Sequence, residues 1–291
     1  MDTALPSSSI SPRELAARLG RADAPLVLDV RREERFAASP FLIAGALRCA
    51  PAAVARWAQD HPPQEVIVYC VHGHDVGRDA AGTLRAAGWD ARFLAGGMDG
   101  GEDGVDDPQA IALWRAVRPP LMRKRPDLGV TGEQRSRWIT RERPKIDRIA
   151  CPWLVRRFID PAAEFFYAPT AQVFAQADRL QAVAYDIPGA AVSHEGERCS
   201  FDALLAAFDL RDPPLHALAA IVRGADTDRL DLAPQSAGLL AFSLGLSRLH
   251  RDDHAMLAAA LPLYDALYAW CRDAAGERHG WNPDLLAGAA P

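Results

Sequence analysis

The residues best suited to covalent chemistry are a cysteine and the short loop that follows it. Val66–Tyr69 is a run of β-branched and aromatic residues that predicts one buried strand, and Cys70 lies where that strand would end. A helix is expected from Gly77 to about Gly88. Loop amides and the helix amino terminus would point toward the sulfur and favour its thiolate, typically by about 0.3–1 kcal/mol. Cys70 is therefore predicted to be a nucleophile.

The loop expected to bind substrate beside Cys70 consists of Val71, His72, Gly73, His74, Asp75 and Val76. Its two histidines are polar, which argues against their packing in the core. They are candidates for tuning the reactivity of Cys70 or for orienting a substrate. The alternative is that both are ordinary loop residues and that Cys70 is a small buried core residue, as free cysteines often are.

A second set of candidate residues lies in the other half of the chain. His194, Glu195, Asp226 and Asp228 form an imidazole–carboxylate set that suits a divalent metal ion. The zinc-protease motif is excluded because Arg198 stands where its second histidine belongs. A calcium-binding EF-hand loop is disfavoured because its glycine and terminal glutamate are missing. The alternative is a structural network of Asp–Arg pairs and loop caps.

The elements that must position Cys70 alternate between strand and helix. Leu26–Val30, Val66–Tyr69 and Ala91–Leu94 are the expected strands, and helical segments such as Pro51–Asp60 separate them. This alternation predicts an α/β domain in which helices flank a parallel sheet. Ligands bind such sheets at the carboxyl ends of the strands, which is where Cys70 lies.

The second half of the chain is expected to be mainly α-helical. Trp138–Arg141 is a candidate edge strand, and Pro262 is expected to kink or divide the last helix, His254–Arg272. These patterns predict a first domain at residues 1–118, a basic linker at 119–137, a second domain at 138–275 and a tail at 276–291.

Basic residues are concentrated around the predicted linker. Between Arg115 and Arg157 there are thirteen Lys/Arg and four Asp/Glu, although the formal net charge of the chain is −5. Nucleic-acid binding is one interpretation. The favoured interpretation is that these arginines pair with acidic groups of the second domain, because no aromatic-interleaved or helix-turn-helix pattern accompanies them.

Length and composition indicate a globular protein rather than a membrane protein. The 291 residues favour two domains, and no apolar run approaches the ~18 residues of a transmembrane helix. The amino terminus lacks the basic and apolar regions of a secretory signal. Five scattered cysteines without a CxxC pair are typical of reduced thiols, so we expect a cytoplasmic protein without membrane insertion.

Four motifs in the first domain resemble those of single-domain rhodaneses. The Cys70–Asp75 loop is similar to their active-site loop, and Leu26–Arg31 contains their Asp-x-Arg signature. Ile43–Leu47 resembles a third motif without its histidine, and Leu94–Met98 resembles their late Leu-x-Gly-Gly turn. The resemblance implies a sulfurtransferase that carries sulfur as a Cys70 persulfide and requires no cofactor for that step.

Two departures from related loops narrow the expected chemistry. Asp75 stands where thiosulfate-using rhodaneses often carry arginine, and its negative charge would repel an anionic donor such as thiosulfate. The related phosphatase loop is Cys-x5-Arg, but Val76 occupies the arginine position, so the phosphate clamp is missing.

Phrases in the second domain resemble the C-terminal domain of the chromate-resistance protein B family. They include Lys145–Leu154, Ser193–Gly196 and Ile221–Asp228, within a match from about Trp138 to Cys271. The resemblance implies an association with resistance to chromate or a related oxyanion. The expected partners are a small sulfane-sulfur donor, a thiol or protein acceptor, and chromate or another oxyanion.

Two other functional classes remain as alternatives. One is a non-enzymatic chromate-responsive sensor or regulator whose basic segment contacts DNA. The other is a redox enzyme that acts on an oxyanion through Cys70, with a resolving thiol such as Cys49.

Overall fold

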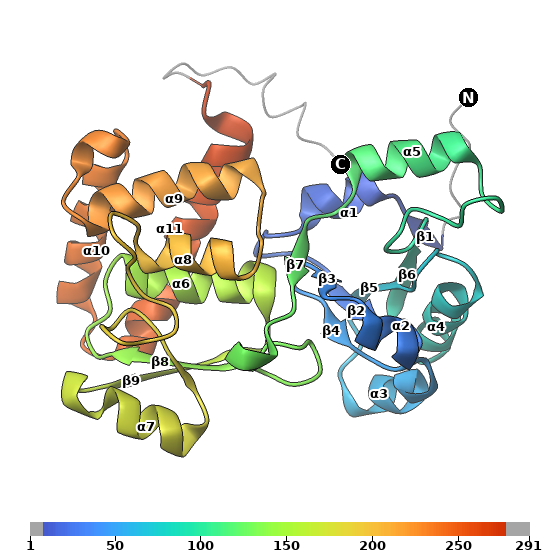
Figure 1. The fold of residues 1–291 in the computed structure, drawn as a ribbon, viewed down its shortest axis with the longest axis horizontal. Helices are drawn as coiled ribbons and strands as arrows, with labels where there is room; N and C mark the ends of the chain where they lie inside the picture. The colour runs from blue at the N-terminus through green and yellow to red at the C-terminus, as the bar shows by residue number, and fades with distance from the viewer. Residues whose placement is uncertain (1–7, 278–291) are drawn as a thin grey trace.

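The computed structural model describes residues 8–277, which fold into two lobes that lie side by side (Figure 1). The first lobe is an α/β unit built on a parallel sheet, and the second is mainly helical. Both features confirm the fold class expected from the sequence. The expected tail at 276–291 lies almost entirely outside the described residues, as does most of the amino-terminal segment that lacks a signal pattern.

The first lobe contains a five-stranded sheet in which every neighbouring pair of strands is parallel. In space the order is β1-β6-β5-β2-β4. The strands are β1 (Ser9–Ile10), β2 (Leu26–Asp29), β4 (Leu47–Arg48), β5 (Glu65–Tyr69) and β6 (Asp90–Leu94). The helices are α1 (Pro12–Arg18), α2 (Glu33–Ala38), α3 (Val54–Asp60), α4 (Asp75–Ala86) and α5 (Pro108–Val117).

The two faces of β5 face different hydrophobic clusters. Val66 and Val68 pack in a cluster with residues of α3 and α4. Ile67 and Tyr69 point the other way, into a cluster that contains Leu15 of α1 and continues into the second lobe. This alternation follows from the two-residue period of a strand, and it buries both faces of the sheet.

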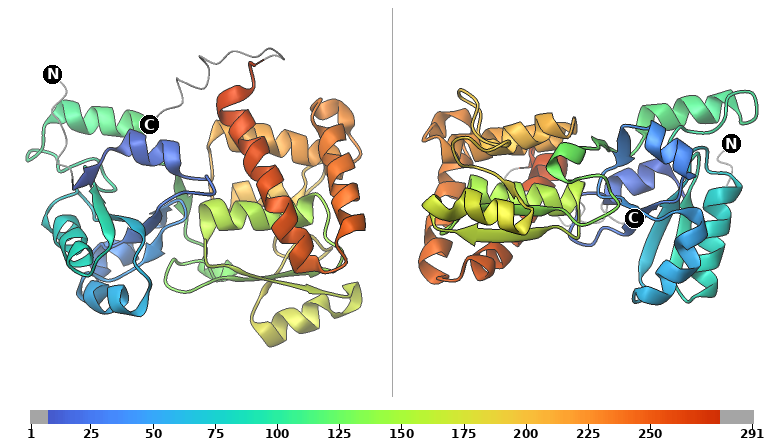
Figure 2. Two further views of the ribbon diagram at one scale, coloured as in Figure 1. Left: turned by 180° about the vertical axis from the view of Figure 1, so that it is seen from behind. Right: turned by 60° about the horizontal axis from the view of Figure 1, so that its bottom comes forward.

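The second lobe is built around a small parallel sheet with the order β10-β8-β9. Helix α7 covers one face and the remaining helices cover the other (Figure 2). The strands are β8 (Arg137–Arg141), β9 (Glu164–Ala168) and β10 (Val183–Ala184). The helices are α6 (Asp147–Leu154), which continues as a π-helical turn at Val155–Ile159, α7 (Val173–Leu180), α8 (Ser200–Ala207), α9 (Pro213–Asp226), α10 (Ser236–Leu249) and α11 (Asp253–Ala269).

The structure contradicts the expected edge position of one strand in the second lobe and the expected division of its last helix. Strand β8 is central rather than an edge, because β9 and β10 pair with its two sides and Trp138 and Ile139 are buried on opposite faces. Pro262 does not divide α11, which runs without interruption from Asp253 to Ala269. Pro262 and Ala258 are both exposed, so the carbonyl that the proline leaves without a helical donor can bond to water.

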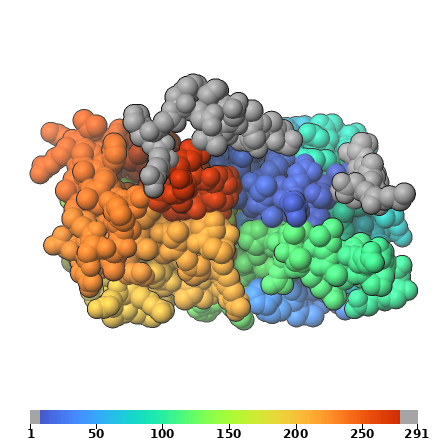
Figure 3. All heavy atoms as spheres, turned by 90° about the horizontal axis from the view of Figure 1, so that it is seen from above, coloured from blue at the N-terminus to red at the C-terminus, as the bar shows by residue number. Residues whose placement is uncertain are grey.

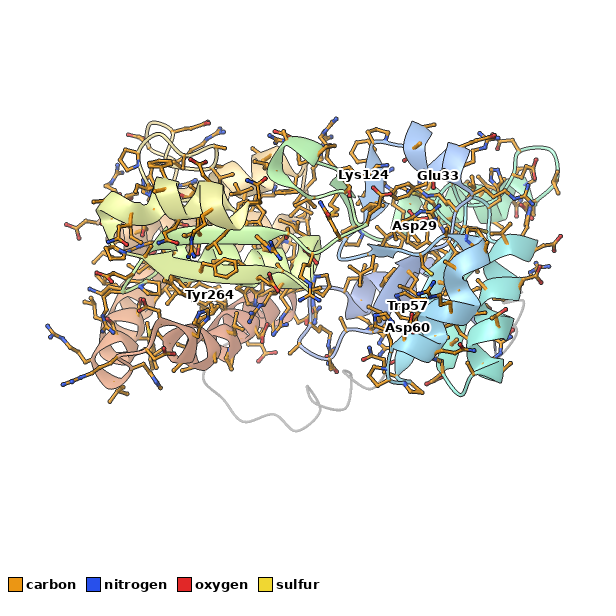
Figure 4. All side chains as sticks on the ribbon, turned by 90° about the horizontal axis from the view of Figure 1, so that it is seen from below. Asp29, Glu33, Trp57, Asp60, Lys124 and Tyr264 are labelled. Carbon is orange, nitrogen blue, oxygen red and sulfur yellow. The ribbon has the colours of Figure 1, made fainter. Side chains whose placement is uncertain are left out.

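The segment between the lobes, residues 119–137, is paired with both of them. Its strand β7 (Leu121–Arg123) pairs antiparallel with β3 (Phe41–Ile43) of the first lobe. The amide of Arg123 donates to the carbonyl of Phe208 in the second lobe at 2.8 Å. Lys124 donates to the Phe36 carbonyl at 2.6 Å and lies over the Phe36 ring (Figure 4). The segment expected as a linker is thus a structural joint.

Direct contacts also join the lobes at the end of α1. The ring of Phe158 lies against Gly20, and the Phe158 carbonyl accepts from the Gly45 amide at 2.8 Å. Near the carboxyl end of the described chain, Arg272 donates to the Ala17 carbonyl at 3.3 Å. Figure 3 shows the corresponding red and blue surfaces in contact. One hydrophobic cluster therefore spans both lobes.

Among residues 8–277, none of the helices combines the length and apolar character that crossing a membrane requires.

Candidate active site and acidic cluster

Cys70 lies at the carboxyl end of β5, between that strand and helix α4. The helix begins at Asp75, two residues before the expected start at Gly77. Cys70 is only 5% exposed, and its Sγ lies 4.0 Å from the His74 carbonyl oxygen. A Cβ placed on Gly77 would lie 3.3 Å from Sγ. The first turn of α4 therefore packs directly against the sulfur, and glycine at position 77 leaves it room.

The loop around Cys70 is held by the Leu94–Met98 turn. The Met98 amide donates to the carbonyls of Cys70 and Val71 at 3.0 and 2.9 Å. Gly73 has φ +76°, and a Cβ there would lie 2.6 Å from the Gly96 amide nitrogen. Only glycine fits this close backbone approach. The two motifs, which are 24 residues apart, thus form one loop system.

Both histidines of the Cys70 loop contact the segment that follows the sheet. His72 Nδ1 lies 2.8 Å from the Gly101 carbonyl oxygen, and His74 Nε2 lies 2.8 Å from Asp106. A backbone hydrogen bond from Glu102, followed by the His74 contact, lowers the pKa of Asp106. Both imidazoles therefore brace the loop. His72 also lines a groove of about 460 Å³ between the Cys70 loop, α5 and β7.

A buried polar group supports the sheet beneath this loop. The Tyr69 hydroxyl donates to Asp29 at 2.9 Å and accepts from the Ile43 amide at 3.3 Å. Arg31 donates to both carboxylate oxygens of Asp29 and to the Phe41 carbonyl. Figure 4 shows Asp29 inside the first lobe. The Asp-x-Arg motif thus ties β2 to β5 and β3.

The second lobe contains a cluster of one histidine and three aspartates. His194 Nε2 lies 3.1 Å from Asp226 Oδ2, 3.2 Å from Asp186 Oδ1 and 3.5 Å from Asp147 Oδ2. Asp147 and Asp186 are buried, whereas the His194 side chain is 40% exposed. Asp147 begins α6, Asp226 ends α9, and the other two lie in the connection between β10 and α8. Three segments distant in sequence meet here.

The backbone next to Asp147 is held in an uncommon conformation. Ile146 has φ +41°, which a β-branched residue rarely adopts. Its amide donates to the Ser243 hydroxyl at 3.0 Å, and its carbonyl accepts from the Tyr264 hydroxyl at 2.7 Å (Figure 4). Helices α10 and α11 therefore fix the position from which Asp147 projects. Strain of this kind is often found at functional sites.

The cluster strongly shifts the proton affinities of its members. The hydrogen bond with Asp147, followed by the charges of the three carboxylates, raises the pKa of His194 to about 9. Burial, followed by repulsion from Asp147 and Asp186, raises the pKa of Asp226 to about 7. Burial also raises the pKa of Asp186. The imidazole is thus cationic at neutral pH.

The sequence identified only part of this cluster. The structure brings His194 and Asp226 together, as the predicted metal set requires, but Glu195 and Asp228 are exposed and lie outside the cluster. Asp147 and Asp186 take part in their place. The sequence carries one partial signal for them: each is an acidic residue beside a strongly apolar segment, where an unpaired carboxylate is costly, but this does not show that the two side chains meet.

Most of the basic side chains between residues 115 and 157 have partners within the molecule. Carboxylate partners are found for Arg125, Arg135, Arg137, Arg141, Arg148 and Arg157. Arg143 instead donates to carbonyls at the end of α10. These contacts agree with the interpretation that the arginines serve acidic groups of the second lobe.

The two lobes match two different protein-family models. Residues 11–103 match the model of the rhodanese-like domain. Solved structures similar to this lobe include a rhodanese homologue from Thermus thermophilus (27% identical, covering 31% of this chain and 94% of that one, TM-score 0.25). Another is a rhodanese-like domain protein from Staphylococcus aureus (25% identical, covering 34% and 96%, TM-score 0.29).

Residues 138–271 match the model of the C-terminal domain of ChrB. A curated relative, Protein ChrB of Cupriavidus metallidurans, is 34% identical over 139 residues, which is 47% of this chain. The match spans about two fifths of that protein's length (41%). The chain therefore joins a rhodanese-like domain at residues 11–103 to a ChrB C-terminal domain at residues 138–271.

Proposed function

We propose that the protein is a sulfurtransferase that carries sulfane sulfur as a persulfide on Cys70. The observation that carries the proposal is the position of Sγ, which lies at the junction of β5 and α4 beside a helix turn that has no side chain at residue 77. A terminal persulfide sulfur needs this space, and its negative charge is favoured by a helix amino terminus.

The reaction is a double displacement. The Cys70 thiolate attacks the outer sulfur of a donor, a new S–S bond forms, and the donor's own bond to that sulfur breaks, so that the leaving group departs with the electron pair. A thiolate of the acceptor then attacks the outer sulfur of the Cys70 persulfide. The S–S bond to Cys70 breaks, and the Cys70 thiolate is regenerated without any net oxidation of the enzyme.

The charges around the loop favour a donor with little negative charge near the transferred sulfur. Asp75 is exposed at the start of α4, and Glu102 and Asp106 lie beside His74. These carboxylates repel thiosulfate, whose two charges lie close to its sulfane sulfur. An organic persulfide places its charged groups farther away. We therefore expect an organic persulfide to be a better donor than thiosulfate.

The second lobe links this activity to resistance against chromate or a related oxyanion in our proposal. The support is its match to the C-terminal domain of ChrB. The alternative redox chemistry with Cys49 as resolving thiol is less favoured, because burial raises the pKa of Cys49 to about 11 and keeps it a thiol at neutral pH. A DNA-binding sensor is also less favoured, because its basic segment is engaged within the protein.

The test is the intact mass of the protein after incubation with thiosulfate, 3-mercaptopyruvate or glutathione persulfide. We expect a gain of one sulfur, about 32 mass units, with glutathione persulfide and a smaller yield with thiosulfate. Cys70→Ala should abolish the gain, and Cys49→Ala should leave it unchanged. Failure of every donor to add sulfur to the folded wild-type protein would refute the proposed activity.

A further inference from the structure

We propose that Asp147, Asp186, His194 and Asp226 bind one divalent transition-metal ion. This inference concerns the second lobe alone and does not depend on sulfur transfer at Cys70. The four side chains come from the start of α6, the end of α9 and the connection between β10 and α8. Ligand atoms of Asp147, Asp186 and His194 all lie within 4.8 Å of one another, and Asp226 Oδ2 lies 3.1 Å from His194 Nε2. A metal ion needs such an arrangement, and a local turn cannot produce it.

The hydrogen bonds available to His194 cannot account for the arrangement. Its Nε2 carries one hydrogen, yet three carboxylate oxygens from three different aspartates lie 3.1–3.5 Å from that nitrogen. One N–H can satisfy only one of them well. Within the described residues, arginines contact only one of the three carboxylates, Asp186, so Asp147 and Asp226 share the imidazole as their nearest cationic side chain. A divalent cation would satisfy all three oxygens at once.

Partners outside the four residues hold two of the carboxylates in place. The amides of Ser200 and Phe201, at the start of α8, donate to the two oxygens of Asp147 at 2.7 and 3.0 Å. Arg141 and Arg148 contact Oδ2 of Asp186, and the Ser200 hydroxyl donates at 2.9 Å to Oδ1, the oxygen that faces His194. Metal ligands are usually oriented by such outer contacts. The carboxylates thus do not depend on His194 for their orientation.

The donor set indicates the kind of ion. One imidazole nitrogen and three carboxylate oxygens suit Mn²⁺ or Zn²⁺, and a site that selects soft ions would need thiolates. The nearby cysteines do not supply them: Cys151 donates to Asp147 at 3.3 Å and Cys199 to Asp202 at 3.4 Å, and burial raises the pKa of both thiols.

The experiment measures metal binding to the full-length protein after treatment with a chelator and dialysis. Calorimetric titration with MnCl₂ and, separately, with ZnCl₂ should give one ion per chain for at least one of the two metals, and native mass spectrometry should show the same stoichiometry. His194→Gln and Asp226→Asn should each weaken that binding by roughly 10–100-fold or more. Circular dichroism verifies that both variants are folded.

Matched controls come from the neighbouring residues that lie outside the cluster. Glu195→Gln and Asp228→Asn remove an exposed carboxylate one or two positions away, and they should change the affinity less than twofold. Absence of binding by either metal to the folded wild-type protein would overturn the proposal. So would equal losses in the cluster variants and the controls, or no loss in a folded His194→Gln variant.

Discussion

The contact between Gly20 and Phe158 allows a sharp test of how firmly the two lobes are joined. Gly20 has φ +76°, and a Cβ at this position would lie 2.1 Å from the Cζ atom of Phe158. Gly20→Ala therefore carries two penalties. The left-handed backbone costs an alanine about 1–2 kcal/mol, and displacing a packed ring typically costs about 1–3 kcal/mol. The free energy of unfolding should fall by about 2–5 kcal/mol.

Gly88→Ala is the matched control, because Gly88 has φ +86° and no heavy atom within 4 Å of its added Cβ. This variant should lose only the backbone part, about 1–2 kcal/mol. Urea unfolding followed by tryptophan fluorescence measures both variants. The difference of about 1–3 kcal/mol between them isolates the clash with Phe158.

A double variant checks that Phe158 is the partner responsible. Adding Phe158→Ala to Gly20→Ala removes the ring that the new methyl group meets, so the two losses should not add, and the coupling should lie at about 0.5–3 kcal/mol. If Gly20→Ala is as stable as Gly88→Ala, or if the losses of Gly20→Ala and Phe158→Ala simply add, the lobes are not packed as described.

Two further predictions concern the first lobe. Gly77→Ala should reduce persulfide formation on Cys70 several-fold, because its Cβ would lie 3.3 Å from Sγ. Gly82→Ala in the same helix, whose nearest atom is 4.0 Å away, should retain full transfer. Equal activity of the two folded variants in the mass assay would contradict this prediction. The hydrogen bond from Arg18, together with that from Arg92, lowers the pKa of Glu65 from 4.5 to about 2. The ionised Glu65 therefore contributes its full stabilisation of the folded protein above about pH 4.5, and this contribution is lost as the pH falls through 2. Glu65→Gln should therefore have a lower free energy of unfolding than the wild type in urea at pH 7, and this difference should disappear between pH 4.5 and 2. A difference that does not change with pH would exclude this ion pair.

The sequence was most informative where the structure depends on neighbours along the chain. The β5–Cys70–α4 unit lies within about 20 residues, and its strand, loop and helix signals could be read directly. The parallel sheet followed from the alternation of strands and helices. Only the start of α4 was misplaced, because Asp75 in the first turn is as good a helix start as Gly77.

The acidic cluster could be predicted only in part, because its members are separated by up to 79 residues. Glu195 and Asp228 carry the same chemical groups as Asp186 and Asp147, and the sequence does not show which of them face inward. A bridge between Glu195 and Arg198 forms the turn that leaves Glu195 exposed. Asp147 could equally have been a simple helix-capping residue. Tertiary packing determines which carboxylates face into the cluster, and the periodicity of the sequence carries no information about that packing.

The way β7 joins the lobes has a consequence for the order of events during synthesis. The first lobe can assemble once about 118 residues have been made, but its strand β3 then still lacks its partner β7. The surface at Gly20 and Gly45 stays uncovered for longer, until Phe158, which packs against it, has been synthesised. At about 5–20 residues per second, those 40 residues take roughly 2–8 s. During this interval the nascent first lobe exposes an unpaired strand edge and an apolar surface, so a chaperone that covers both would improve the yield of native protein.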